Sequence, residues 1–178
     1  MHLKQYFDLW TTSAPITAEY DHWVKWGKLL NIYLCDEPIP INVETVGDFP
    51  RRCKQGELLN VELRFFLLQC EIFSGQNDFD ARSTKGIASE ALIPCGTFSV
   101  DGNADFKESA EVLLNGRIIS AARFKNDCGE NCYKFELGFQ GYVFRAVALG
   151  CEENFGLNPG DIIHGLFTVC AVIKRAAA

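Results

Sequence analysis

The last third of the chain constrains the fold most strongly, because its strand-like runs are separated by connections too short for a long helix. Residues 133–139 alternate apolar and polar side chains without a break, which is the period of a strand with one buried face. Gln140 and Gly141 follow, and apolar sequence resumes over 142–149. Two such runs across a two-residue turn that contains glycine predict a β-hairpin. An all-β or mainly β protein is therefore expected.

Further strands are expected on both sides of this hairpin. Residues 58–73 and 112–124 have the composition and alternation of long strands, and 162–173 is a closing strand that is apolar on both faces. Residues 66–68 are apolar at every position, which predicts burial on both sides of the sheet. Gly116 lies inside a predicted strand and indicates a bulge or a bend.

The connections between these strands carry their own signals. Residues 126–131 are expected to form a hairpin loop, and Asn-Pro-Gly-Asp at 158–161 predicts a tight turn. Residues 74–86 are polar and are expected to form a long loop, either mobile or functional.

The parity of each strand predicts which side chains form the core. Phenylalanine, of which the chain holds 14, is a residue of cores and strands. The side chains expected to be buried are Val61, Leu63, Ile118, Phe135, Leu137 and Phe167.

The N-terminal third is less regular. Apolar residues recur at helical spacing over 17–27 and predict a short helix, and residues 28–34 predict a strand. These elements are expected to form an extension over 1–56, packed on a barrel domain over 57–178 in one compact unit. The residues expected to join the two parts are Trp10, Trp23 and Trp26.

The order of elements in the C-terminal two thirds resembles an OB-type small β-barrel. Leu-Asn-Gly-Arg-Ile at 114–118 stands where such barrels have a bent first strand, and hairpin, tight turn and closing strand follow. The segments 93–98 and 160–167 are similar to those of an uncharacterised bacterial family with no assigned activity. The resemblance covers roughly residues 57–173 and implies an antiparallel, OB-like barrel, but it carries over no functional residue. A related closed β-barrel is the alternative, because 150–160 is too short for the helix that normally plugs an OB barrel.

Composition limits the classes of partner. The net charge of -6 argues against a dominant nucleic-acid or anionic-membrane partner. No run approaches the roughly 20 apolar residues of a membrane helix, and the N-terminus lacks the apolar core of a signal peptide. A cytoplasmic protein is expected, and its 8 cysteines are then expected to be reduced thiols.

Two kinds of chemical site receive little support. Cys128 and Cys132 have a spacing that zinc permits, but no second pair of ligands follows, so no metal and no other cofactor is expected. A loop disulfide between the same two cysteines is an alternative under oxidation. His164 lies near Asp161, which is expected to orient it, but no nucleophile is indicated, and a small hydrolase is only the third hypothesis. We therefore expect no catalytic residue.

A binding role remains. Residues 112–149 hold five basic and three acidic residues, which gives +2 against -8 for the rest of the chain. The first hypothesis is a non-catalytic binding or assembly module whose partner is another protein or a second copy of the chain. The second is an OB-type protein that binds single-stranded nucleic acid on aromatic and basic side chains. The candidate binding residues are Arg117, Arg123, Tyr133, Tyr142 and Arg145.

Overall fold

The computed structural model describes residues 3–10, 15–25, 28–34, 39–47, 53–84, 86–98 and 107–175. As expected from the sequence, this part of the chain is mainly β. Its strands are β1 (Ile16–Lys25), β2 (Leu29–Leu34), β3 (Ile39–Thr45), β4 (Leu58–Phe73), β5 (Ala91–Ile93), β6 (Glu111–Lys125), β7 (Asn131–Phe139), β8 (Tyr142–Ala148) and β9 (Ile162–Arg175). Its helices are the 3-10 helix η1 (Leu3–Tyr6) and α1 (Gln76–Arg82).

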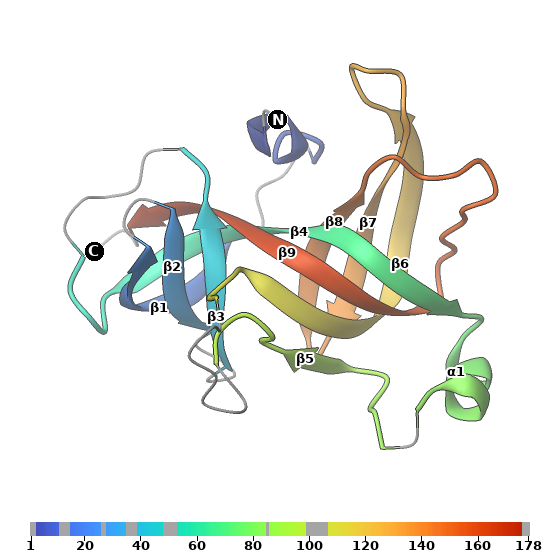
Figure 1. Cartoon of the computed structure of the whole chain (residues 1–178), viewed down its shortest axis with the longest axis horizontal. Coiled ribbons are helices and arrows are strands. Elements are labelled where there is room, and N and C mark those ends of the chain that lie inside the picture. Colours follow the sequence, from blue (N-terminus) through green and yellow to red (C-terminus); the bar gives the residue numbers. More distant parts are fainter. Residues whose placement is uncertain are drawn as a thin grey trace. The chain divides into compact units, whose positions relative to one another are not determined.

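The strands form one 9-stranded sheet in the order β1-β2-β3-β9-β4-β8-β7-β6-β5, with additional pairings β1–β4 and β9–β6 (Figure 1). The sheet is mixed rather than antiparallel, because β3 pairs with β9, and β4 with β8, in parallel. Parallel partners need a long crossover connection, and the strands that intervene in the chain supply it in both cases.

Contacts divide the chain into two compact units. Unit 1 comprises Met1–Arg64, Pro94–Val112 and Thr168–Ala178, and unit 2 comprises Phe65–Ile93 and Leu113–Phe167. The division of the chain into 1–56 and 57–178 stays a prediction.

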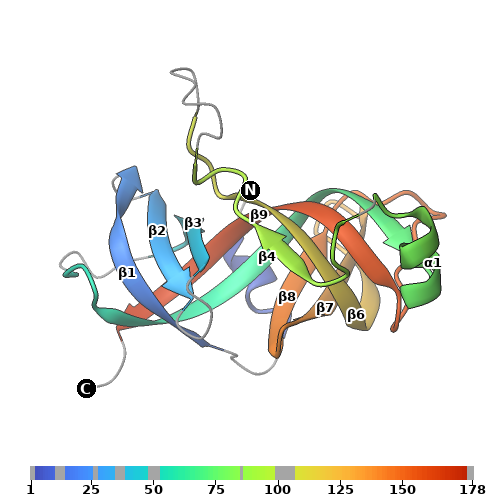
Figure 2. The same ribbon diagram turned by 90° about the horizontal axis from the view of Figure 1, so that it is seen from below.

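In unit 1, the segment expected to be a helix over 17–27 is the strand β1 (Figure 2). This strand pairs with β2 along one edge and with β4 along the other, and Ala18 lies opposite both Leu34 and Leu59. Ala18 and Tyr20, two positions apart, are the buried side chains of the strand. Pairing on both edges satisfies the backbone without a helix, so tertiary structure overrides the helical spacing of the apolar residues. The strand predicted over 28–34 is confirmed as β2.

A buried arginine holds the N-terminal segment of unit 1. Arg64 on β4 is only 1% exposed and donates to the backbone oxygen of Phe7 at 2.9 Å. Its guanidinium lies 4.8 Å from the ring centre of Phe7 and 4.7 Å from that of Trp10, which are cation–π distances. Trp10 therefore packs against Arg64 of β4, and its role in joining an extension to a barrel stays a prediction. Trp23 is half-buried, and Trp26 lies outside the described residues.

The core of unit 2 is aromatic. The ring of Phe65 on β4 lies 4.6 Å from that of Phe144 and 6.1 Å from that of Phe167, and Phe135 lies 6.5 Å from Phe167. The six side chains predicted to be in the core of the protein are all buried.

The predicted hairpin is confirmed as β7 and β8, which pair antiparallel from Tyr133 with Ala148 to Phe139 with Tyr142. Gln140 has φ 44° and Gly141 has φ 85°. Positive φ at both central residues matches the type I′ turn, whose twist suits a two-residue hairpin.

The expected loop over 74–86 contains the helix α1. Its buried residue Phe79 packs edge-on against Phe73 at 5.0 Å and joins Ile162 in a small apolar cluster. Arg82 donates to both carboxylate oxygens of Asp78 one turn earlier, and this bond lowers the pKa of Asp78. The sequence did not indicate the helix, because a single buried residue shows no periodicity.

Two local predictions on the long strands have different outcomes. The pairing of β6 with β7 has an irregularity between Ile118 and Ser120, while a bulge or bend at Gly116 stays a prediction. Gly116 allows close approach, because a Cβ there would lie 2.9 Å from the backbone oxygen of Gly138. The prediction of burial on both faces over 66–68 is wrong, since Leu68 is 53% exposed.

Replacing Phe135 by alanine should destabilise the protein by about 3–5 kcal/mol, because the side chain is fully buried among other aromatic rings. Chemical denaturation measures this change. The matched control is Val143→Ala on β8, whose side chain is 47% exposed and should cost less than about 0.5 kcal/mol. Equal effects from the two substitutions would contradict the assignment of the core.

Candidate functional site between β4 and the β8–β9 connection

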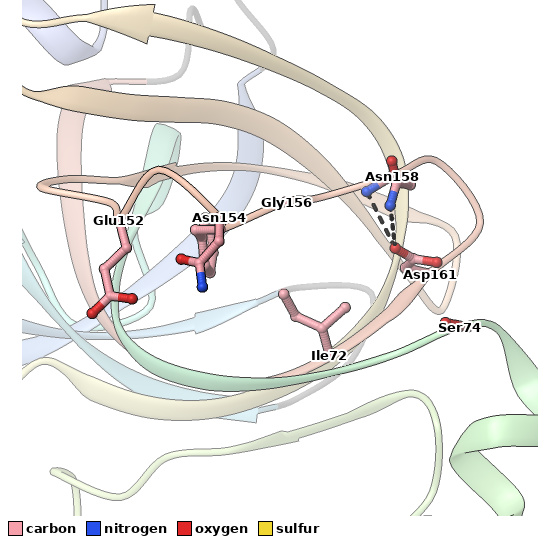
Figure 3. Close-up of a pocket in the computed structure, with 8 residues that line it drawn as sticks. Ile72, Ser74, Glu152, Asn154, Gly156, Asn158 and Asp161 are labelled. Carbon is pink, nitrogen blue, oxygen red and sulfur yellow. Dashed lines mark hydrogen bonds between the residues drawn. The ribbon is translucent and has the colours of Figure 1, made fainter.

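Unit 2 has a pocket of about 510 Å³ between the end of β4 and residues 149–161, here called the β8–β9 connection (Figure 3). Ile72 points from β4 toward the connection, and the side chains of Glu152 and Asn154 point from the connection toward β4. The volume lies in the range of small-molecule sites. The lining residues are Ile72, Ser74, Glu152, Asn154, Phe155, Gly156, Asn158 and Asp161.

The predicted tight turn forms the far end of the connection. The backbone N–H of Asp161 donates to the oxygen of Asn158 at 3.1 Å, and Gly160 has φ 94°. Proline followed by a residue with positive φ is typical of a type II turn. One carboxylate oxygen of Asp161 accepts from both the backbone and the side-chain nitrogen of Asn158, each at 3.2 Å, so the carboxylate is fixed in place (Figure 3). As expected, the connection contains no helix.

Three of the five predicted binding residues donate hydrogen bonds to the backbone of this connection. The Tyr133 hydroxyl donates to the backbone oxygen of Phe155 at 3.0 Å, and the two rings meet edge-on at 5.6 Å. Arg117 donates to the oxygen of Gly160 at 3.0 Å, and Arg123 to that of Glu153 at 3.3 Å. Side chains of β6 and β7 therefore fix the backbone on which the pocket is built.

The other two predicted binding residues are engaged elsewhere. Arg145 is 7% exposed and lies 3.6 Å from the carboxylate of Glu136 on the neighbouring strand. Tyr142 is half-buried, and its ring stacks on Phe144 at 5.6 Å. The five residues thus do not converge on one exposed surface, and direct contact of any of them with a ligand stays a prediction.

The pocket is polar and acidic. None of its lining residues, all within the described part of the chain, is lysine or arginine. Glu152 and Asp161 supply carboxylates, Asn154 and Asn158 supply amides, and Phe155 adds an apolar surface. Arg82 approaches from α1, but it donates to the backbone oxygen of Ile72 at 2.9 Å and to Asp78. The pocket therefore offers two carboxylates, which only accept hydrogen bonds, and amides, which both accept and donate.

The predicted partner of His164 is wrong. Its Nδ1 lies 2.6 Å from the side-chain oxygen of Asn115, while Asp161 is bonded to Asn158. The amide nitrogen of Asn115 donates to the backbone oxygen of Ala88 at 2.7 Å, so its oxygen faces the imidazole and Nδ1 carries the proton. The pair lies on β6 and β9, which are far apart in the sequence, and no local pattern could have predicted it.

The cysteine loop shows no metal centre. Cys128 is exposed, whereas Cys132 is buried and its thiol donates to the backbone oxygen of Glu130 at 3.5 Å. Within the described ranges, no three His, Cys, Asp or Glu side chains are grouped so that they could hold a metal ion. Over the same ranges, no helix is long and apolar enough to span a membrane.

The chain matches no family model, no curated protein sequence and no solved structure.

The residues of the pocket were not predicted from the sequence. Only the turn at 158–161 gave a signal there, because polar residues in a connection show no period and their meeting with β4 is a tertiary event.

Replacing Tyr133 by phenylalanine should cost about 0.5–1.5 kcal/mol, because it removes the bond to Phe155 and keeps the packed ring. Denaturation in urea measures the loss. Tyr133→Ala removes the ring as well and should cost clearly more. A phenylalanine variant as stable as the wild type would show that this hydroxyl does not hold the connection.

Proposed function

We propose that the protein is a non-catalytic binding module and that its ligand occupies the pocket between β4 and the β8–β9 connection. The observation that carries this proposal is the preformed polar lining on a tethered connection. Loops fixed by a rigid sheet are common places for binding residues. A preformed site also loses little conformational entropy when a ligand binds, because its residues are already ordered.

The chemistry of the lining favours a ligand rich in hydrogen-bond donors. Carboxylate and amide oxygens accept from hydroxyl or ammonium groups, and Phe155 can cover an apolar face of the ligand. A phosphate would meet two carboxylates and no basic side chain among the lining residues. A protein partner would present such donors as lysine, arginine, serine or threonine side chains. Assembly with another protein, or with a second copy of the chain, is thus part of the proposal.

Single-stranded nucleic acid is the second candidate, and it rests on the basic and aromatic residues of β6 and β7. Those side chains are occupied in holding the connection, and the net charge of -6 opposes phosphate binding. We therefore rank it below the first candidate, with a small hydrolase third.

We also propose that the circuit β9-β4-β8-β7-β6 is a closed β-barrel, OB-like or related. The pairing β1–β4 returns the run β1-β2-β3-β9-β4 to its start, and β9–β6 does the same for β9-β4-β8-β7-β6. A closed circuit leaves no free edge on which chains could aggregate. In this proposal η1 and the strands of residues 1–56 are an extension of the barrel, and the protein works in the cytoplasm. The free thiols of Cys70, Cys132, Cys151 and Cys170 are compatible with that compartment.

Calorimetric titration tests the proposal with three probes: a disaccharide, an aliphatic diamine and a labelled single-stranded oligonucleotide. We expect saturable binding of the disaccharide or the diamine, and none of the oligonucleotide at physiological salt. Glu152→Gln combined with Asp161→Asn should remove the binding, because both carboxylates line the pocket. Glu153→Gln is the matched control, since the Glu153 side chain is next to Glu152 in the sequence but does not line the pocket.

Two results would contradict the proposal. One is that neither donor-rich probe binds, or that binding survives loss of both pocket carboxylates. The other is salt-sensitive binding of the oligonucleotide that disappears in Arg117→Ala combined with Arg145→Ala, which would favour the nucleic-acid hypothesis.

A further inference from the structure

Three cysteines of unit 2 lie on β4, on β7 and in the β8–β9 connection. Cys70 lies on β4 two residues before Ile72, and Cys151 lies in the connection directly before Glu152. Cys132 lies on β7, one residue after Asn131, whose backbone oxygen accepts from the N–H of Cys151 at 2.8 Å. All three thiols are free.

Cys70 and Cys151 follow the last pair of a parallel ladder. In the ladder of β4 and β8, Phe65 lies opposite Ala146 and Leu67 opposite Ala148. Cys70 and Cys151 each lie three residues beyond this last pair in the same chain direction, Cys70 still on β4 and Cys151 in the connection. Neighbouring strands are about 4.8 Å apart, so we expect the two cysteines to come within the range of Cα separations that a disulfide can bridge.

The surroundings of the thiols agree with this placement. Burial raises the pKa of Cys70 to about 11, and the nearby thiol of Cys151 contributes to the rise. Burial and then Cys132 raise the pKa of Cys151, while Arg123 and a backbone N–H of Tyr133 oppose that rise. The charge of Arg123 favours the thiolate of Cys151, which is the reactive form, so we take Cys151 as the first nucleophile.

Cys132 is the less suitable partner for Cys151. It is 0% exposed, and its thiol is directed to the backbone oxygen of Glu130. Cys70 and Cys151 are both partly exposed, so a small disulfide can reach them.

We propose that Cys70 and Cys151 are a redox modification site, which a low-molecular-weight disulfide converts into an intramolecular disulfide. The Cys151 thiolate attacks one sulfur of the small disulfide, whose S–S bond breaks and releases a thiolate that takes up a proton. The Cys70 thiolate then attacks the Cys151 sulfur and expels the second small thiol. Two protein thiols are oxidised, and one small disulfide is reduced to two thiols.

The new bond would join the two walls of the pocket. Cys70 belongs to the β4 wall and Cys151 begins the wall formed by the connection. Oxidation would therefore restrict how far the connection can move from β4. The inference does not depend on what the pocket binds.

Peptide mapping of the full chain tests the proposal. The protein is incubated with oxidised glutathione at mildly alkaline pH, free thiols are alkylated, and the digest is analysed by mass spectrometry. We expect a peptide that joins Cys70 to Cys151 and lacks the two thiol hydrogens. Its rate of formation should rise about tenfold per pH unit while the pH is below both pKa values, because the thiolate fraction rises in that proportion.

Variants separate the two chemical steps. Cys70→Ser should stop at a glutathione adduct on Cys151, whereas Cys151→Ser should give neither that adduct nor the cross-link. Cys128→Ser is the control and should behave as the wild type, because this exposed thiol lies in the β6–β7 hairpin loop. Circular dichroism shows whether each variant is folded. The peptide map of the wild-type protein tests the cross-link even if a variant does not fold.

Other products would overturn the proposal. A cross-link between Cys128 and Cys132, or between Cys132 and Cys151, would place the reactive pair elsewhere. An adduct on wild-type Cys151 that never proceeds to a cross-link would show that Cys70 is out of reach.

Discussion

The pocket of unit 2 depends on hydrogen bonds that cross from the β6–β7 hairpin to the β8–β9 connection, and three of them come from side chains. Arg117, Arg123 and Tyr133 each donate to a backbone oxygen of a connection that has no helix or strand of its own. A connection of this length would otherwise sample many conformations, and each fixed residue costs conformational entropy. The donors sit on paired strands, so their positions are set by the sheet and its aromatic core.

This tethering explains why the same residues attract two opposite interpretations. Basic and aromatic side chains on neighbouring strands are the composition of a nucleic-acid surface. In this structure the polar ends of these side chains are directed to backbone oxygens. The side chains that line the pocket come instead mainly from the connection that they support. Glu152 and Asp161 then present carboxylates where the sequence suggested a weakly basic face. Charge counted along a segment thus differs from charge presented at a site.

The sequence predicted the parts of the fold that depend on local periodicity and turn chemistry. The β7–β8 hairpin and β4 are examples, because alternation and the Gln140–Gly141 turn act over a few residues. It failed at β1, whose strand form depends on pairing with β4 far along the chain, and at α1, whose single buried residue Phe79 gives no period. It also failed at the pocket, since no pattern in one segment shows which polar residues of another it will meet.

Hydrogen exchange of the ligand-free protein, read at single amides of the connection, tests the central claim most directly. If the connection is preformed, the amides of Cys151, Asn158, Gly160 and Asp161 should be protected, because each donates a hydrogen bond. Protection should fall when Arg117 is replaced by alanine, since the turn that contains Gly160 then loses one of the bonds that hold it. Exchange of all four amides at the rate of an unstructured peptide would contradict a preformed pocket, because the pocket would then have no fixed wall.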